Sequence, residues 1–132
     1  MFRKETTDML AILSNTIENA GKLSDSLQDY WNARGVYQSI SLFETEREFM
    51  EALATKPYES IILEGISNPL EIIPQMQVLC PGCKIAVVTD NRDPAVDSKT
   101  AVACHRLGVD MMLTRADLEQ PLATLSKKLN LM

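Results

Sequence analysis

Short apolar runs rich in β-branched residues alternate along this chain with helical patterns, and the alternation occurs five times. The runs predict strands at residues 9–13, 37–43, 60–63, 84–88 and 111–113. A strict alternation of strands and helices favours a parallel sheet with helices on both faces and right-handed crossovers. The length of 132 residues suits one such domain and leaves little room for two. We therefore expect a short polar N-terminal segment over 1–8 and a single α/β domain over 9–132.

The predicted helices have identifiable ends. The first helical stripe is followed by Gly35, which suits a left-handed helix cap. Thr45 and Glu48 form a capping box that opens the second helix. Pro69 suits the first turn of the third helix, and Pro74 predicts a kink or a later start. Asp117 is expected to cap a final helix with a leucine stripe, which first of all indicates core packing.

Composition narrows the classes of partner. The net charge is −5 and no block of lysine or arginine occurs, so we expect no nucleic-acid binding by this chain alone. No apolar run approaches the roughly 20 residues that cross a bilayer, and residues 1–8 lack the apolar stretch of a signal peptide. We expect a cytoplasmic protein with no membrane partner. The single histidine, His105, excludes catalytic schemes that need two.

Five segments, in this order, resemble parts of the receiver domain of bacterial two-component response regulators: 31–35, 46–53, 58–64, 84–89 and 107–115. With the five strand–helix units in which they lie, the resemblance covers nearly the whole chain. The resemblance implies a flavodoxin-like (βα)5 three-layer sandwich with a parallel five-stranded sheet in the order 2-1-3-4-5. It also implies a signalling domain that is not an enzyme.

A working receiver binds Mg²⁺ through two acidic residues after the first strand and accepts a phosphoryl group on an aspartate after the third. It also needs a threonine or serine after the fourth strand and a lysine after the fifth, all at the carboxyl ends of the strands. In this sequence the acidic pair aligns with Ser14 and Asn15, the aspartate with Glu64 and the lysine with Arg115, and Thr89 alone is retained. Mg²⁺ prefers charged oxygen ligands, and the longer glutamate misplaces its carboxylate for phosphoryl transfer. We expect that phosphorylation is lost.

The favoured interpretation is therefore a degenerate receiver-like domain that regulates through protein–protein contacts, independently of phosphorylation and without a cofactor. The alternative is an active phosphoacceptor or a small-ligand site at the same crevice. Glu64 itself has two interpretations. Its carboxylate imitates the phosphorylated state beside Arg115 and Thr89, or it is a solvated strand-end residue paired loosely with Arg115.

Three cysteines, an odd number without an export signal, make a disulfide unexpected. Cys80-Pro-Gly-Cys83 ends a helix and opens a strand, the reverse of the order in thioredoxin-like motifs, so redox catalysis is not expected. A further alternative is a zinc-stabilised interaction module with ligands Cys80, Cys83, Cys104 and His105. Against it, adjacent residues on a helix point about 100° apart, and Pro-Gly is ordinary turn chemistry.

The resemblance also implies a contact face made by the fourth helix, the fifth strand and the last helix. Candidate residues are Val102, Met111, Met112 and Leu118. Strand alternation predicts that one of the two methionines points into the core and the other outward. Methionine suits adaptable contacts, and an edge strand needs cover. We expect a protein partner of unknown identity, with a homodimer as one form of this contact.

Overall fold

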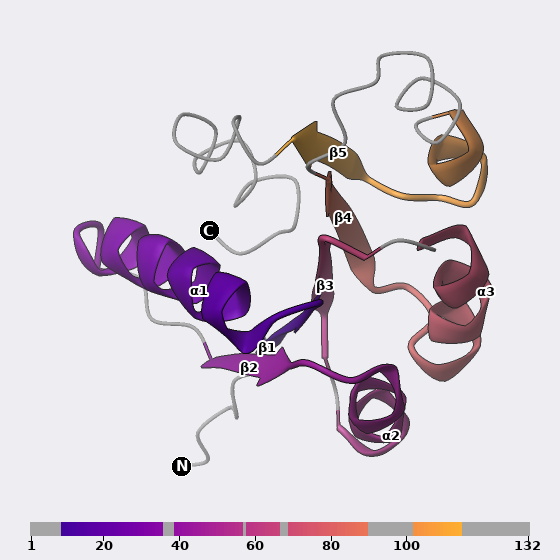
Figure 1. Cartoon of the computed structure of the whole chain (residues 1–132), viewed down its shortest axis with the longest axis horizontal. Coiled ribbons are helices and arrows are strands. Elements are labelled where there is room, and N and C mark those ends of the chain that lie inside the picture. Colours follow the sequence, from indigo (N-terminus) through magenta and orange to yellow (C-terminus); the bar gives the residue numbers. More distant parts are fainter. Residues whose placement is uncertain (1–8, 36–38, 57, 67–68, 90–101, 115–132) are drawn as a thin grey trace, which may run out of the picture.

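The computed structural model describes residues 9–35, 39–56, 58–66, 69–89 and 102–114 (Figure 1). The strands form one parallel sheet in the order β2-β1-β3-β4-β5. They are β1 (Met9–Ser14), β2 (Ser39–Phe43), β3 (Ser60–Glu64), β4 (Lys84–Thr89) and β5 (Met111–Thr114). The predicted fold class and strand order are confirmed.

The helices cover both faces of this sheet (Figure 1). They are α1 (Ile17–Asn32), α2 (Glu46–Thr55) and α3 (Pro69–Leu79), and residues 102–106 are also helical. α1 packs on one face, while α2 and α3 pack on the other. The predicted final helix and the predicted loop at 90–98 lie outside the described residues. No helix in the described part of the chain is long and apolar enough to cross a membrane.

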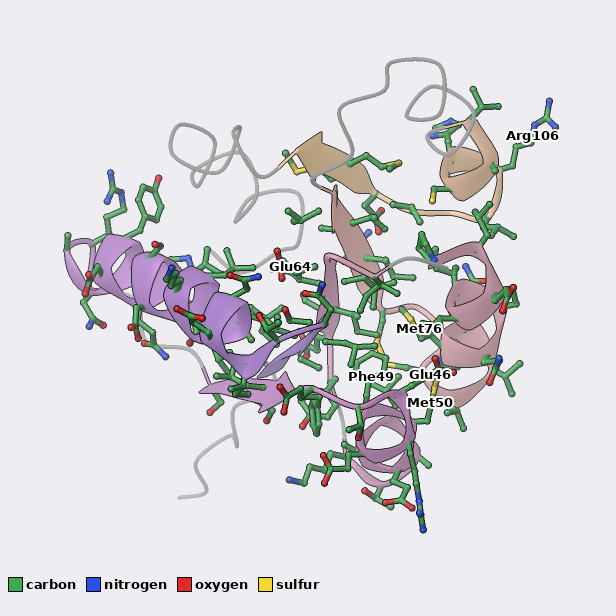
Figure 2. The ribbon with its side chains drawn as sticks, viewed as in Figure 1. Glu46, Phe49, Met50, Glu64, Met76 and Arg106 are labelled. Carbon is green, nitrogen blue, oxygen red and sulfur yellow. A yellow bond between two sulfur atoms is a disulfide. The ribbon has the colours of Figure 1, made fainter. Side chains whose placement is uncertain are left out.

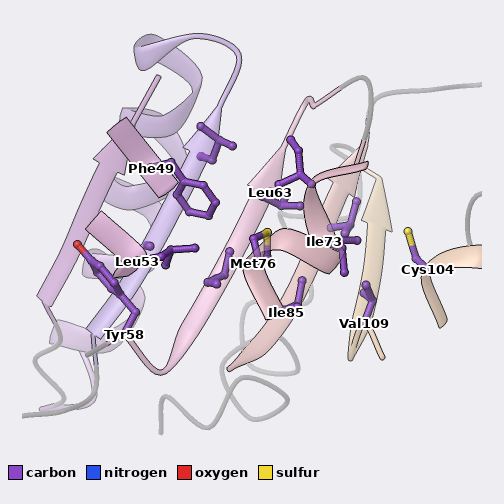
Figure 3. Packing of buried hydrophobic residues seen from close by; sticks show 14 residues of the cluster. Phe49, Leu53, Tyr58, Leu63, Ile73, Met76, Ile85, Cys104 and Val109 are labelled. Atoms are coloured by element: carbon purple, nitrogen blue, oxygen red, sulfur yellow. The ribbon is translucent and has the colours of Figure 1, made fainter. Parts of the chain in front are cut away.

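Alternation along the strands divides the core into two clusters. The first lies between the sheet and α2 and α3, and Figure 3 shows Phe49, Met76 and Cys104 gathered in it. The second lies under α1, where Trp31 is fully buried against strand residues such as Ile12 and Ile62. Because the central strands are buried on both faces, they are continuously apolar in sequence.

The helix ends follow their local chemistry. Thr45 caps α2, because its Oγ1 accepts a hydrogen bond from the Glu48 backbone N–H at 3.3 Å. Thr16 caps α1 in the same way through the Asn19 N–H at 3.2 Å. Gly35, after α1, has φ 74°, a left-handed conformation that suits glycine.

α3 corrects one expectation. It begins at Pro69 and continues through Pro74, so the predicted late start is wrong. Pro69 fits the first turn because an N–H there would have no partner within the helix. Pro74 is exposed and forgoes one helical hydrogen bond, while burial of Ile72, Ile73 and Met76 holds the helix against the sheet.

Candidate functional site at the carboxyl ends of the strands

A buried hydrogen-bonded pair occupies the centre of the crevice. Ser14 ends β1, Glu64 ends β3, and the two are partners in the sheet register. The Ser14 hydroxyl donates to Oε1 of Glu64 at 2.5 Å and accepts from the Thr16 backbone N–H at 3.2 Å. The exposed fraction is 0% for Ser14 and 2% for Glu64.

Glu64 is therefore not a solvated strand-end residue, and that interpretation is wrong. Its strand is central, with β1 on one side and β4 on the other. By alternation Glu64 shares the α1-covered face with Ile62, and Figure 2 shows its side chain on the α1 side of β3. The neighbouring elements exclude water from the carboxylate, and the Ser14 hydroxyl replaces part of its hydration.

Asn15 lies apart from this pair. It is exposed and lines an open hollow of about 290 Å³ together with Glu44, Glu46 and Gly65. Successive residues at the end of β1 thus point in different directions, Ser14 into the protein and Asn15 into the hollow. The two positions that align with the receiver's acidic pair do not act on one centre here.

Sequence reasoning did not identify Glu44 and Glu46 as residues of this crevice. Oε2 of Glu44 accepts from the Ile17 backbone N–H at 3.2 Å, at the N-terminus of α1, where a negative charge is favourable. The position of Glu44 in the sequence could have identified it. Glu44 directly follows β2, and the carboxyl ends of parallel strands lie at one edge of the sheet.

The chemistry of the hollow is that of exposed acceptors with negative charge. Glu44, Glu46 and Asn15 are all exposed. None of them is an aspartate, and none follows β3, where a receiver carries its phosphoacceptor. Over the described ranges, no group of three or more His, Cys, Asp or Glu side chains is arranged to hold a metal ion.

Of the remaining two pocket positions, Thr89 and Arg115, the structure places only the backbone of Thr89. Thr89 ends β4, one residue beyond Val88, which is the register partner of Glu64. Thr89 in turn pairs with Thr114 at the end of β5. Arg115 follows Thr114 and lies outside the described residues, so an approach of Arg115 to Glu64 stays a prediction.

The predicted contact face contains a shallow hollow of about 420 Å³. Val102, which is 54% exposed, lines it together with Met111 and Met112 of β5. The two methionines lie on opposite faces of the sheet as alternation requires, yet both are half-buried, Met112 against the first core cluster and Met111 against the second. The expectation that one points outward is wrong, because β5 contacts a core on each face. Leu118 lies outside the described residues.

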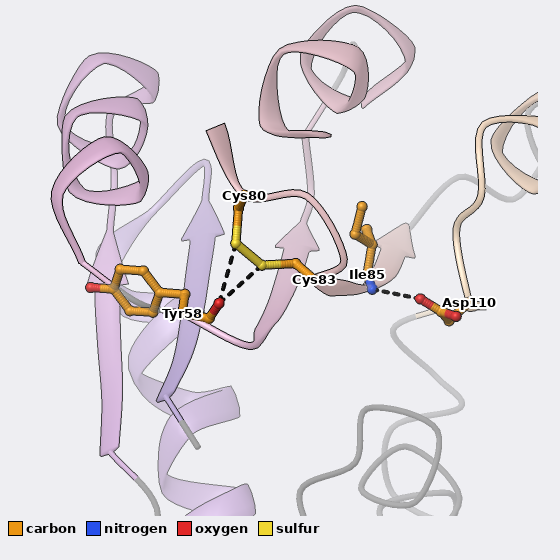
Figure 4. The surroundings of a disulfide bond; sticks show 5 residues. All are labelled: Tyr58, Cys80, Cys83, Ile85 and Asp110. Carbon is orange, nitrogen blue, oxygen red and sulfur yellow. Dashed lines mark hydrogen bonds between the residues drawn. A yellow bond between two sulfur atoms is a disulfide. The ribbon is translucent and has the colours of Figure 1, made fainter. Parts of the chain in front are cut away.

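The cysteine motif departs from expectation. Cys80 and Cys83 form a disulfide with their Cα atoms 5.8 Å apart (Figure 4). The Pro-Gly turn brings them together, and Gly82 takes φ 88°, which other residues rarely adopt. The expectation of no disulfide is therefore wrong. It was based on the cellular compartment and did not consider the geometry of the turn. As predicted, the motif lies at the amino ends of the strands, away from Glu64.

The structure does not bring the four alternative zinc ligands together. Cys80 and Cys83 are bonded to each other, and Cys104 is fully buried in the first core cluster. Burial raises the pKa of the Cys104 thiol, which disfavours the thiolate that a metal requires. His105 is exposed on the helix at 102–106, as expected for a surface histidine.

Comparisons with known proteins agree with this fold. No protein-family model matches the sequence, and no curated protein matches it. Solved structures do match. A response regulator from Thermotoga maritima has a TM-score of 0.75 at 12% identity, over 95% of this chain and 99% of that one. A CheY-like receiver domain protein from Methanospirillum hungatei JF-1 has a TM-score of 0.68 at 16% identity, over 93% and 94%.

A third solved structure is a response regulator from Burkholderia pseudomallei that carries a phosphorylated aspartic acid, a calcium ion and citrate. It has a TM-score of 0.64 at 20% identity, over 92% of this chain and 72% of that one. At these identities the likeness concerns the fold. The chain has the flavodoxin-like fold of CheY-like receiver domains, with a serine–glutamate pair where the crevice of such a domain lies.

Proposed function

We propose that this chain is a receiver-like regulatory domain of two-component signalling that acts through protein contacts without being phosphorylated. The observation that carries the proposal is the burial of Glu64, which is 2% exposed and hydrogen-bonded to Ser14. A phosphoacceptor must reach the phosphorus of its donor in line, and small misplacements of the attacking atom are costly. The Glu64 carboxylate is covered, so a donor cannot reach it, and its hydrogen bond to Ser14 holds the oxygen away from an in-line position.

The absence of an acidic pair after β1 supports the same proposal. Ser14 already donates one hydrogen bond to Glu64 of β3 and accepts another from the Thr16 backbone N–H, so its hydroxyl is committed within the protein. Asn15 is neutral and points into the open hollow. Mg²⁺ is held best by carboxylates in octahedral geometry, and these two residues supply none.

A phosphodonor experiment tests this proposal. The full chain is incubated with acetyl phosphate and Mg²⁺, and its intact mass is recorded beside that of an active receiver domain treated identically. We expect the active domain to gain a phosphoryl group and this chain to gain none. A stoichiometric adduct at Glu64 or a neighbour would instead favour the alternative, an active phosphoacceptor.

The second alternative, a small-ligand site, concerns the hollow lined by Asn15, Glu44 and Glu46. Its exposed carboxylates repel phosphate-like anions, so only a cationic or neutral ligand suits it. Calorimetric titration with Mg²⁺, a cationic probe, is expected to give no binding heat, and saturable heat would support a ligand site.

We further propose that Glu64 holds the domain in one signalling state. Its burial and its hydrogen bond to Ser14 support a fixed carboxylate. Glu64→Gln keeps the shape and removes the charge, so amide signals of β5 residues such as Met112, which lie away from residue 64, should shift. A spectrum that changes only around residue 64 would contradict this role.

The proposed partner is a protein, either a second copy of this chain or another one, docked at the face of Val102, Met111, Met112 and Leu118. The exposure of Val102 and the mainly apolar hollow beside it support this face. A cytoplasmic setting, which two-component signalling implies, is part of the same proposal. Affinity capture with the wild-type chain and a Val102→Asp control would identify partners that depend on the face.

A further inference from the structure

The corner between α3 and β4 carries chemistry that the proposed function does not use. Cys80 directly follows α3, Cys83 directly precedes β4, and a disulfide joins them (Figure 4). We infer that this pair is a site of reversible thiol–disulfide exchange whose reaction partners are low-molecular-weight disulfides and thiols, such as glutathione disulfide and glutathione.

The corner is accessible to such partners. Both cysteines are half-buried, and Cys83 lines an open hollow of about 210 Å³ with Gly82 and Lys84. The third cysteine, Cys104, is 0% exposed. Because exchange requires attack at a sulfur atom, reactivity is expected at the corner and not in the core.

The same backbone suits both redox states. The Cα separation of 5.8 Å lies within the range that a disulfide requires. The carbonyl oxygen of Tyr58 lies 3.2 Å from Sγ of Cys80 and 3.1 Å from Sγ of Cys83. In the dithiol state either S–H can donate to this carbonyl, so reduction provides a hydrogen bond without moving the chain.

Access distinguishes the two cysteines. Cys83 lines the hollow, whereas Cys80 is not among the described residues that line it. A low-molecular-weight disulfide that enters the hollow meets the Cys83 sulfur first, and the attacking species is the thiolate. Cys83 is therefore the expected nucleophile, and Cys80 the resolving residue.

The exchange proceeds in two balanced steps. The Cys83 thiolate attacks one sulfur of glutathione disulfide, so that its S–S bond breaks, glutathione thiolate leaves and a mixed disulfide forms. The Cys80 thiolate then attacks the Cys83 sulfur, which forms the internal disulfide and releases a second glutathione. The protein dithiol loses two electrons and two protons, and glutathione disulfide gains both.

Alkylation with peptide mapping tests the inference. The full chain is equilibrated in buffers of varied glutathione to glutathione disulfide ratio, quenched with N-ethylmaleimide under native conditions and digested with trypsin. Cleavage after Arg47 and Lys84 leaves Cys80 and Cys83 on one peptide, since Lys56 precedes a proline, and Cys104 falls on the peptide 100–106. We expect the 48–84 peptide to carry two adducts in reducing buffer, to lose both together in oxidising buffer, and to regain both on reduction.

Single variants test the order of attack. Cys80→Ala should accumulate a stable mixed disulfide at Cys83, and Cys83→Ala should form its mixed disulfide more slowly. Circular dichroism confirms that each variant is folded. Three results would overturn the inference: two adducts that persist in excess glutathione disulfide, a native disulfide that resists glutathione, or a reduced pair that holds zinc and is thereby protected from both reagents.

Discussion

Ser14 and Glu64 determine what the centre of the crevice can do. The Ser14 hydroxyl donates a hydrogen bond to Oε1 of Glu64 across the ends of two neighbouring strands. Because both groups are buried, leaving either without a partner costs more free energy than it would at the surface. The hydrogen bond therefore contributes more to stability here than an exposed one would. The same burial keeps the carboxylate away from solutes, which is the basis of the proposal that it is not phosphorylated.

Removing the hydroxyl tests the energetic role of this pair. Ser14→Ala leaves the buried Glu64 carboxylate without one donor, so the free energy of unfolding should fall by about 1–3 kcal/mol. Urea denaturation measures this change. Ser26→Ala, on the exposed face of α1, is the matched control and should change stability little. Equal stability of the two variants would contradict a structural role for the hydrogen bond.

The buried thiol of Cys104 is expected to lower the free energy of unfolding as the pH becomes alkaline. Its burial raises the thiol pKa in the folded state above the ordinary value of about 8.5. Above that ordinary value the unfolded chain loses the proton while the folded chain keeps it, so the contribution to stability is present at neutral pH and lost as the pH rises. Thermal denaturation between pH 7 and about 10 should show a steeper decline for the wild type than for Cys104→Ala. Identical declines would count against this assignment.

The helices and strands follow local rules closely. A Thr45 cap with Glu48 three residues later, a glycine after α1, and continuous apolar runs in central strands all predict the elements observed. Departures come where tertiary packing decides. Pro74 remains inside α3 because its buried neighbours contribute more than the lost hydrogen bond costs.

The Thr45 cap can be tested directly. Thr45→Ala removes the side-chain acceptor for the Glu48 N–H and should lower the free energy of unfolding by about 1 kcal/mol. Thr45→Ser keeps the hydroxyl and should retain most of the stability. If the serine variant loses as much as the alanine variant, the methyl group and not the cap is the important feature.

The candidate site was less predictable than the fold. Alignment identified Ser14, Asn15 and Glu64 as residues at strand ends, because strand register follows from periodicity. Alignment could not show that Ser14 points inward and Asn15 outward, since that depends on the turn into α1. The bond between Cys80 and Cys83 was missed because turn geometry, not compartment, brings them together.

At the scale of the whole molecule, the three chemically distinct features lie at different parts of the sheet. The Ser14–Glu64 pair lies at the carboxyl ends of the strands, and the cysteine pair lies near the amino ends. The mainly apolar hollow is lined by Met111 and Met112 of β5, which is an edge strand of the sheet. Among the described residues, the Glu64 carboxylate at the centre of the crevice is covered and a mainly apolar hollow lies at the edge, which supports the proposed regulation by contact.

Self-association tests this arrangement. If copies of the chain meet at the edge face, Val102→Asp should lower the mass measured by light scattering at high concentration, because a charge would be buried at the contact. Val78→Asp is the matched control, since Val78 is 79% exposed on α3. A wild type that stays monomeric at high concentration removes the dimer and leaves the face to a different partner.

The central claim is that the crevice does not bind a phosphoryl group, and beryllofluoride tests it most directly. This anion imitates the phosphoryl group, and a solved receiver domain similar to this chain is described as activated by BeF3. Amide spectra of the full chain are recorded with Mg²⁺, with and without beryllofluoride. We predict no change at Gly65 and Ile66, which directly follow Glu64. Saturable shifts at these amides and along β4 and β5 would contradict the account.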